Sequence, residues 1–208
     1  MYKQARPHQK RRKRSGVEVR EEGLIAARRL LLDGGPAAVT LASVGHEIGM
    51  SHANVLHHFG SAAGLQSALM GSMVTDLTTA LDNVVELLKT DATAPRTVAD
   101  RVFDAFDKGG AGQLAAWIIL SGDVEHLEPV REAVRGLVEA IVGQSTDDAA
   151  PDRVRAAVLM MAVSAFGDAL IGPHVRDMLD QPEDAMRDLV ARILPLFLIP
   201  TGIPPATP

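Results

Sequence analysis

Residues 40–65 read TLASVGHEIGMSHANVLHHFGSAAGL and contain two short helical patterns joined by a glycine turn. Thr40 can cap the first helix, and Ser51 can cap the second, which runs to about Phe59. Residues 49–51 supply the turn between them. The first helix has apolar side chains on one face at positions i, i+3 and i+7, namely Leu41, Val44 and Ile48. Two short capped helices with a tight glycine turn predict a helix-turn-helix.

Helices are also predicted on both sides of this stretch. Residues 15–18, SGVE, have the form of a capping box, and an apolar pattern continues to the stop signal at 34–36, with Gly23 as a weak point inside the helix. Ser61 can cap a fourth helix. Its apolar stripe advances in steps of three and four through Leu65, Leu69, Met73, Leu77, Leu81, Val84 and Leu88. A stripe of this length predicts one rod of roughly 40 Å.

The rest of the chain also has helical periodicity. Further helices are predicted over residues 95–107, 111–121, 127–143, 151–172 and 182–199. Pro95 and Pro182 fall in the first turn of their helices, where proline is well accommodated. No segment alternates convincingly with a period of two. The predicted fold class is therefore all-α.

The composition restricts the chemistry and the compartment. The 208 residues include no cysteine, which excludes disulfides, zinc-thiolate sites and thiol nucleophiles and is consistent with the cytoplasm. The apolar runs are much shorter than the roughly 20 residues of a membrane span, and no secretory signal is expected. The net charge is −5, yet residues 1–16 carry seven Lys or Arg and no acid, so the N-terminal end attracts anions.

Three of the seven histidines, His52, His57 and His58, raise the alternative of a metal site. At about 100° per residue, no two of them share a helix face at i, i+4, as paired ligands require. The run HEIGM at 46–50 begins like a zinc-protease helix but has Met50 in place of the second His. The sequence also has no Ser-His-Asp signature and no glycine-rich phosphate loop. We therefore expect no metal, no cofactor and no enzyme.

The second helix of the motif has two different sides. Its predicted buried side consists of Val55, Leu56 and Phe59. Its predicted exposed arc consists of Ala53, Asn54, His57 and His58. Asn54 can pair with adenine at N6 and N7, the Ala53 methyl can contact thymine, and His57 can donate to a phosphate or a base. An ordinary solvated face is the alternative interpretation.

The stretch TLASVGHEIGMSHANVLHHFGSAAGL resembles the DNA-binding signature of the TetR family of transcriptional repressors, and LIAARRLLLDGG resembles the end of that family's first helix. The resemblance covers about residues 16–65. It implies a homodimer whose recognition helices enter successive major grooves of a palindromic operator, and release of the DNA when a small molecule binds the C-terminal domain. It also implies DNA contacts from Thr40, Ser51, His52, Ala53, Asn54 and His57.

Three positions depart from the family pattern. Leu56 stands where the family usually has a phosphate-contacting Tyr, and Ala62 stands where it usually has a Lys. Gly45 replaces the usual Ala, at a helix-propensity cost of about 1 kcal/mol. We expect a basic arm to replace the two lost contacts by reaching into the adjacent minor groove, through Lys10, Arg11, Arg12, Lys13 and Arg14. A solubilising tail and a membrane-surface role are the alternatives for this arm.

The resemblance divides the chain into a basic mobile arm at 1–15, a helix-turn-helix DNA-binding domain at 16–65, and an effector-binding and dimerisation domain at 66–208. The last two helices are assigned to the dimer interface because the family's final helix pair forms a four-helix bundle with its mate. The assigned residues are Val154, Ala157, Met161, Ala165, Ala169, Ala185, Leu189, Ile193 and Leu196. An ordinary core within one chain is the alternative.

Bulky side chains of the same domain are the candidates for an effector pocket: Met70, Met73, Phe103, Phe106, Trp117, Met160 and Phe166. Core packing is the alternative for each of them. We expect a small, largely apolar effector rather than a strongly anionic one, because Lys and Arg are few in this half. A cation would find partners among Asp104, Asp123, Glu125 and Asp168.

The rival function is a sequence-nonspecific or architectural DNA-binding protein, and activation is the alternative to repression.

Overall fold

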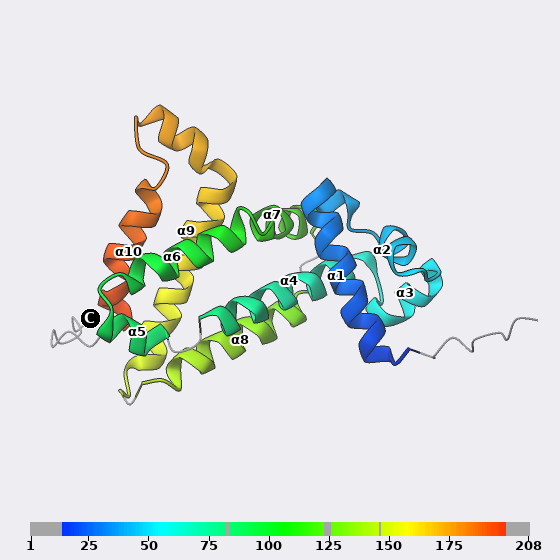
Figure 1. Ribbon diagram of the computed structural model, residues 1–208, viewed down its shortest axis with the longest axis horizontal. Coiled ribbons are helices and arrows are strands. Elements are labelled where there is room, and N and C mark those ends of the chain that lie inside the picture. Colours follow the sequence, from blue (N-terminus) through cyan, green and yellow to red (C-terminus); the bar gives the residue numbers. More distant parts are fainter. Residues whose placement is uncertain (1–13, 82–83, 123–125, 146, 199–208) are drawn as a thin grey trace, which may run out of the picture.

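The computed structural model describes residues 14–81, 84–122, 126–145 and 147–198, and every regular element within them is a helix (Figure 1). The prediction of an all-α fold is therefore confirmed. The helices near the N-terminus gather at one end of the molecule, and those near the C-terminus gather at the other (Figure 1).

The N-terminal end contains α1 (Gly16–Gly34), the short 3₁₀ helix η1 (Pro36–Ala38), α2 (Leu41–Ile48) and α3 (His52–Phe59). The predicted capping box is present, since Ser15 Oγ accepts from the Glu18 N–H and the Glu18 carboxylate accepts from the Ser15 N–H. Thr40 and Ser51 each accept from the N–H three residues later. Gly49 has a φ of 67°, so the turn between α2 and α3 requires a residue that tolerates the left-handed region.

The single rod predicted after Ser61 is instead two helices. Ser61 caps α4 (Ala62–Ala80), which ends at Leu81, and a separate α5 (Val84–Thr90) follows. At 1.5 Å per residue, the 19 residues of α4 span about 28 Å. Three hydroxyls near its end donate to carbonyls four residues earlier: Thr75, Thr78 and Thr79. β-branched residues whose hydroxyls bond back to the helix weaken it, which is consistent with the end of α4 here. The apolar stripe did not predict this end, because a stripe indicates only which side of a helix is buried.

Five more helices complete the described chain: α6 (Ala94–Phe106), α7 (Ala111–Ser121), α8 (Glu128–Val142), α9 (Ala150–Met178) and α10 (Ala185–Leu198). They agree with the predicted helices apart from two boundaries. α9 has 29 residues and continues through Pro173, past its predicted end at residue 172. α10 begins at Ala185 rather than at Pro182.

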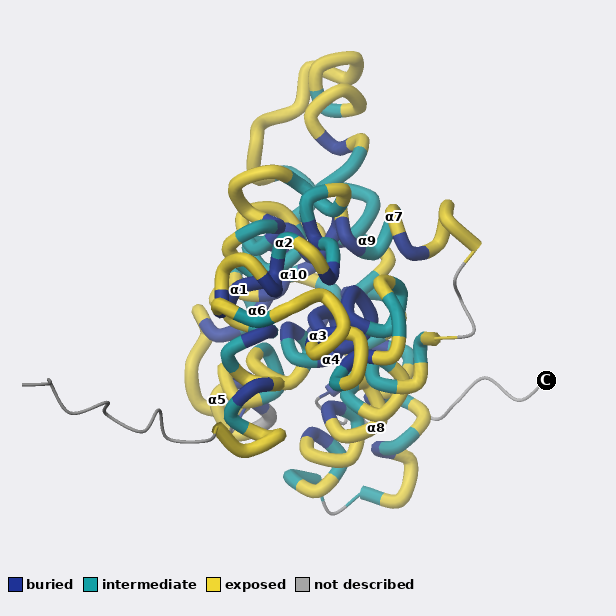
Figure 2. The backbone as a smooth tube through the Cα atoms, turned by 90° about the vertical axis from the view of Figure 1, so that its right-hand side faces the viewer, coloured by how far each residue is buried: buried dark blue, intermediate teal, exposed yellow. Residues whose placement is uncertain are grey.

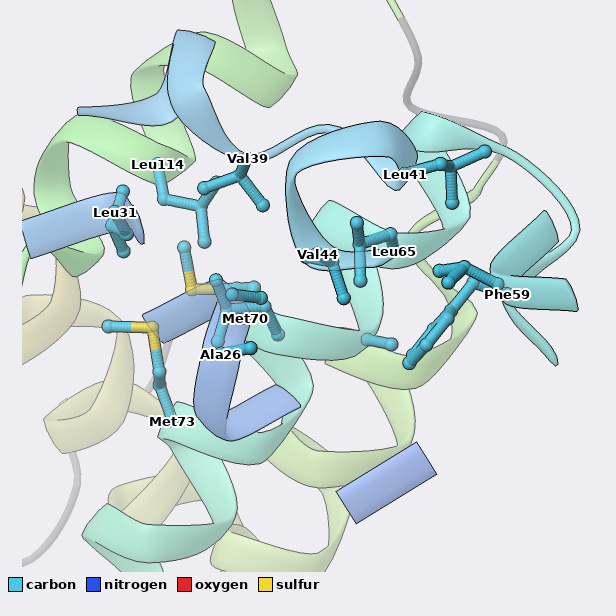
Figure 3. Close-up of a cluster of buried hydrophobic side chains, with 14 of the residues drawn as sticks. Ala26, Leu31, Val39, Leu41, Val44, Phe59, Leu65, Met70, Met73 and Leu114 are labelled. Atoms are coloured by element: carbon cyan, nitrogen blue, oxygen red, sulfur yellow. The ribbon is translucent and has the colours of Figure 1, made fainter. Parts of the chain in front are cut away.

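One cluster of buried side chains holds α1, α2 and α3 together (Figure 3). Its members include Ala26, Leu31, Val44, Phe59, Leu65, Met70 and Leu114. Met70 belongs to α4 and Leu114 to α7, so both lie beyond residue 65. The first three helices therefore share their core with the part of the chain that follows them.

A second cluster joins α6, α9 and α10 to the ends of α4 and α8. Its members include Leu81, Val102, Phe103, Leu137, Met161 and Leu194. Helix α8 packs alongside α4, and the two run together between the ends of the molecule (Figure 1). Helices α4 and α8 thus connect the first cluster to the second.

Helix α9 has two apolar sides. One side packs on α6, α8 and α10, while the C-terminal part of the helix extends away from the rest and is largely exposed (Figures 1 and 2). Among the described residues, α9 is the one helix long and apolar enough, by length and composition, to cross a membrane. Only 22% of its most apolar window is buried within the chain. Much of this helix is therefore available to a partner surface.

Candidate functional site

Helix α3 presents a mostly polar side to solvent. Val55 and Phe59 are buried in the first cluster. The predicted contact residues at this helix are all exposed: Ser51, His52, Ala53, Asn54 and His57. The prediction that Leu56 packs on the preceding helices is wrong, because its side chain is 39% exposed. At about 100° per residue, Leu56 falls at the edge of the buried side rather than within it.

Helix α1 holds the C-terminal half of α3. A Cβ on Gly23 would lie 3.0 Å from two carbons of the Phe59 ring, so glycine permits this close approach. The Arg20 guanidinium lies 5.0 Å from the centroid of the same ring. Arg20 Nη1 also donates to the His58 carbonyl oxygen at 2.7 Å. Gly23, the predicted weak point of α1, is therefore a place where α1 and α3 approach closely.

The turn between α2 and α3 is also tightly packed. The Met50 N–H donates to the Gly45 carbonyl oxygen over 2.7 Å. A Cβ on Gly45 would lie 2.7 Å from the Met50 carbonyl oxygen and 3.4 Å from Val55 Cγ2. Gly45, which departs from the family pattern, thus leaves room for the backbone of the turn at Met50. The contact between these two backbone segments helps to orient α3.

Two of the predicted DNA contacts are capping hydroxyls. Thr40 Oγ1 accepts from the Ser43 N–H at 3.0 Å and lies 2.8 Å from the Ser43 hydroxyl. Ser51 Oγ accepts from the Asn54 N–H at 3.3 Å. A hydroxyl that accepts one hydrogen bond still has its own proton to donate. Both side chains can therefore cap their helices and also donate to a phosphate oxygen.

Positive charge is sparse on this surface in the described part of the chain. Helix α3 contains no Lys or Arg. Arg14 donates to the Ile48 carbonyl oxygen at 3.0 Å and pairs with Glu22 at 2.9 Å, which fixes it at the end of α2. Arg29 pairs with Glu47 at 3.4 Å. The other members of the predicted basic arm, Lys10, Arg11, Arg12 and Lys13, lie outside the described residues.

In the described part of the chain, the histidines of α3 do not belong to a cluster of three or more metal-ligating side chains. The His57 and His58 rings meet edge to face, with 5.6 Å between their centroids. Within the residues that the structure describes, no group of three or more His, Asp or Glu is arranged to hold a metal ion. The exposed His52 and His57 are thus available as hydrogen-bonding groups.

An apolar cavity of about 120 Å³ is a second candidate site. It lies between α4, α5, α6, α8, α9 and α10, and every described residue of its lining is apolar. The lining includes Val74, Leu77, Phe106, Ile141, Val154 and Met161. A wall without a polar group can select a ligand by shape and apolarity alone.

Of the seven side chains predicted to line an effector pocket, only Phe106 lines this cavity. The others lie elsewhere: Met70 and Met73 in the first core cluster, Phe103 in the second, Met160 and Phe166 half-buried on α9, and Trp117 exposed on α7. Large side chains fill the interior, whereas this cavity remains mainly between aliphatic ones. The structure therefore does not bring the seven predicted residues together around one cavity, and their role in effector binding stays a prediction.

The residues predicted for the dimer interface fall into a buried group and an exposed or half-buried group. Four are buried within the chain, namely Val154, Ala157, Met161 and Ala165, and thus have no surface to offer a second copy. The others are exposed or half-buried: Leu189 and Leu196 exposed, Ala169, Ala185 and Ile193 half-buried. The outward side of α9 carries instead Leu159 and Val163, and its projecting C-terminal part exposes Ile171, Val175 and Met178. The period of the helix is as predicted, but the inward and outward sides of α9 are exchanged.

Arginines pair with the acidic residues that link α6 to α10. Arg187 lies 2.9 Å from Asp104 and 3.3 Å from Asp100. Burial raises the pKa of the Asp104 carboxyl, but hydrogen bonds from Arg187 and Lys108 outweigh this effect and hold its pKa below the ordinary value. Burial in turn lowers the pKa of Arg187, yet the hydrogen bonds to Asp104 and Asp100 raise it overall. This ion-pair cluster keeps its charges outside the cavity.

The carboxylates predicted as partners for a cationic effector do not line the cavity either. Asp104 is paired as described, and Asp168 pairs with Arg176 eight residues later on α9. Asp123 and Glu125 lie outside the described residues. The described cavity therefore has no carboxylate with which to balance the charge of a buried cation.

The chain is similar to known proteins in both sequence and fold. Residues 24–69 match the family described as bacterial regulatory proteins, tetR family. A curated relative, the HTH-type transcriptional regulator BetI of Rhizobium meliloti, is 32% identical over 120 residues, which is 56% of this chain and 58% of that protein. The matched segment thus spans less than two thirds of the relative.

Solved structures share the fold at low identity. The multidrug binding protein EbrR complexed with proflavin aligns over 86% of this chain and 99% of its own, with a TM-score of 0.56 and 17% identity. Its complex with imidazole has a TM-score of 0.55 and 19% identity, over 90% of this chain and 98% of its own. A protein from Mesorhizobium loti that is assigned to the TetR family has a TM-score of 0.53 and 15% identity. It aligns over 89% of this chain and 98% of its own.

Proposed function

We propose that this chain, which belongs to the tetR family of bacterial regulatory proteins through residues 24–69, is a transcriptional repressor controlled by a small molecule. It binds a palindromic operator as a homodimer, acts in the cytoplasm where its DNA target lies, and performs no catalytic step. One observation carries the proposal. The first half of α4 packs under α1–α3, whereas its second half lines the apolar cavity.

The DNA-binding part of the proposal rests on the exposed side of α3. His52, Asn54 and His57 supply hydrogen-bonding groups that can reach base edges or phosphates, and Ala53 supplies a methyl group. Thr40 and Ser51 contribute hydroxyls at the starts of α2 and α3. Two copies of α3 about 34 to 36 Å apart would enter successive major grooves.

The basic arm supplies the positive charge that α3 lacks. Residues 1–13 contain six Lys or Arg, and the described Arg14 is held against the end of α2. The arm therefore starts from a fixed point beside the helix-turn-helix. Cationic arms of this kind add phosphate contacts and can enter the minor groove. We assign it the backbone contacts that the family usually obtains from the Tyr and Lys replaced by Leu56 and Ala62.

The homodimer part rests on the outward apolar side of α9. Leu159 and Val163 are exposed on this side, and Ile171 is exposed further along the same helix. The nearby α10 adds exposed Leu189 and Leu196. Exposed apolar surface on consecutive turns of a helix marks an interaction site. A second copy of the same helix pair covers it in the proposed dimer, through the exposed residues rather than the buried ones.

The effector is proposed to be small, apolar and uncharged. Its site is the cavity, whose described lining is entirely apolar, and burying an unpaired charge there would be costly. The EbrR protein of similar fold was solved in complex with proflavin. An uncharged effector is proposed for this chain because Asp104 and Asp168, the described carboxylates that could have balanced a cation, are paired with arginines.

Helix α4 is the proposed route from the cavity to the DNA. Val74 and Leu77 line the cavity, and Leu65 and Met70 of the same helix lie beneath α1–α3. A ligand that prefers a shifted α4 would change the distance between the two recognition helices of the dimer. The shift in DNA affinity is limited by the ligand's differential affinity for the two states.

The sequence-nonspecific alternative is favoured by one observation, the absence of Lys and Arg from α3. Specificity distinguishes the two functions. Purified protein is incubated with sheared DNA of its source at physiological salt, and the bound fragments are sequenced. A repressor enriches a palindrome and prefers it by roughly 10³ or more over random DNA. Fragments recovered in proportion to their abundance would support the architectural function instead.

A further inference from the structure

Leu56 is an exposed apolar side chain at the edge of the solvent-facing surface of α3. It is 39% exposed on α3, and the exposed His57 follows it directly. The buried Val55 and Phe59 fix the orientation of the helix on the first core cluster. At about 100° per residue, Leu56 lies about 80° from the middle of that buried side, and His57 points directly away from it.

Leu56 forms a small apolar patch with Ala53. The two residues are separated by three positions, so their Cβ atoms are neighbours on one flank of the helix, about 5 to 6 Å apart. Both are exposed, and exposed His52 and His57 border them. A two-residue patch among polar groups is far too small for a protein interface, which needs on the order of 1,000 Å².

The major groove offers a single apolar group of matching size. Its base edges carry donors, acceptors and the C5 methyl of thymine. Leucine has no donor for a phosphate oxygen, unlike the Tyr usual at this position. We propose that Leu56, together with Ala53, reads a thymine C5 methyl in each half-site. This inference rests on the proposed function, since it requires α3 to lie in the major groove.

The test first selects a preferred sequence from random duplex DNA with the full chain. Each thymine of one half-site is then replaced in turn by uracil, which removes only the C5 methyl. We expect one position at which uracil weakens binding by about four-fold, the effect of losing one buried methyl group. Substitution in both half-sites weakens binding by about 15-fold, if the two contributions multiply.

The Leu56→Ala variant decides whether Leu56 is the partner of that methyl. It is expected to bind the thymine site more weakly and to respond to uracil at this position by less than two-fold. Leu56→Met keeps an apolar side chain and is expected to retain the response to uracil. Ile25→Ala, which removes an exposed apolar side chain from α1, is the matched control and changes neither quantity. Thermal melting checks that each variant is folded.

Two outcomes would overturn the assignment while leaving sequence-specific binding intact. One is an equal response of the wild-type protein and Leu56→Ala to uracil at every thymine. The other is a loss of affinity in Leu56→Ala that is the same for thymine and uracil sites, as expected if Leu56 only packs on the sugar-phosphate backbone. Failure to select any sequence in the first step would instead overturn the proposed function as well.

Discussion

The backbone of Pro129 leaves no room for a side chain on Gly71. A Cβ at position 71 would lie 2.8 Å from the Pro129 carbonyl oxygen and 3.0 Å from its carbonyl carbon. Helix α4 and the first turn of α8 therefore meet backbone to backbone. This contact lies between the first core cluster, which includes Met70, and the cavity, which Val74 helps to line.

Gly71→Ala is therefore expected to destabilise the protein. Alanine has the better helix propensity by about 1 kcal/mol, but α8 must move to admit the methyl group. Overpacking of this kind typically costs about 1–3 kcal/mol, so the net free energy of unfolding is expected to fall. Urea denaturation followed by circular dichroism measures the change.

Gly136→Ala is the matched control, because a Cβ there would meet no atom within 4 Å. Position 136 is an exposed site in α8, where the gain in helix propensity is unopposed. The control is expected to raise the free energy of unfolding by about 0.5–1 kcal/mol. A rise in the free energy of unfolding in both variants would contradict the close contact at Gly71.

Local hydrogen-bonding patterns were the most predictable part of the fold. Ser15, Thr40, Ser51 and Ser61 all cap their helices as the sequence indicates. A cap depends on a side chain and an N–H three residues away, so four consecutive residues contain its determinants. The turn at Gly49 is local for the same reason, since its positive φ is a property of one residue.

Features that depend on distant parts of the chain were harder to predict. Helix α9 is apolar on two sides, so its periodicity locates the stripes but does not distinguish the core from the outward side. That is why Val154 and Ala157 were assigned to an interface although they line the cavity. The cavity is the space left between packed helices, and the type of a residue does not predict whether such a space lies beside it. Leu56 illustrates the same limit on the recognition helix.

Asp104→Asn tests the ion pairs between α6 and α10. The pKa of Asp104 is below its ordinary value in the folded protein. Such a carboxylate stabilises the fold fully above its unfolded pKa of about 3.9, and the contribution is lost as the pH falls through the lower folded pKa. We expect the variant to be less stable than wild type at pH 7, by on the order of 1 kcal/mol because the side chain is partly exposed.

The difference in stability between the two proteins is expected to shrink as the pH falls below about 4. Melting temperatures measured from pH 7 to pH 3 provide the comparison. Asp177→Asn, an exposed carboxylate on α9, serves as the reference for loss of a surface charge. A difference that stays constant over this pH range would show that the charge of Asp104 is not the stabilising feature.

Ala157→Val tests the apolar cavity. The two added methyl carbons enter a space of about 120 Å³ next to a side chain that is already buried. Burial of about 0.8 kcal/mol per carbon exceeds the lower helix propensity of valine, so the melting temperature is expected to rise. Apolar cavities of similar size accept benzene, which makes benzene a suitable uncharged probe.

Benzene is expected to raise the melting temperature of the wild-type protein, because a ligand stabilises the state that binds it. The increase is expected to be smaller in Ala157→Val. Ala156→Val, a neighbouring position outside the cavity lining, is the control and retains the wild-type response. Equal responses to benzene in all three proteins would place its binding site elsewhere.

Charge on the outward side of α9 is expected to prevent dimerisation. Leu159 and Val163 are 66% and 61% exposed and lie one helical turn apart. The double variant Leu159→Lys/Val163→Lys places two like charges in the proposed interface, where they cannot be paired. Sedimentation velocity at micromolar concentration is expected to give a monomer, and affinity for a palindromic site is expected to fall.

The matched control changes two exposed apolar residues of α7, with Ile119→Lys/Leu120→Lys. These side chains are 56% and 86% exposed. The control is expected to sediment as the wild-type protein does. A wild-type dimer that survives the α9 substitutions but dissociates with the α7 substitutions would move the interface to α7.

Removal of residues 1–13 tests the role of the basic arm. The deletion removes six Lys or Arg but keeps Arg14, which is bound to the Ile48 carbonyl oxygen. Each phosphate contact that is lost reduces the slope of log affinity against log salt by about 0.9. We therefore expect weaker operator binding at low salt and a flatter dependence on salt, as measured by fluorescence anisotropy.

A full-length variant with glutamine at positions 10–13 separates charge from chain length. If phosphate contacts are the function of the arm, this variant behaves like the deletion, because it loses four of the same cations. If the arm acts only as a solubilising tail, both variants keep the wild-type salt slope. An unchanged slope of log affinity against log salt in the deletion would show that the arm makes no phosphate contacts. Other residues of the described helices would then have to replace the phosphate contacts that Leu56 and Ala62 cannot make.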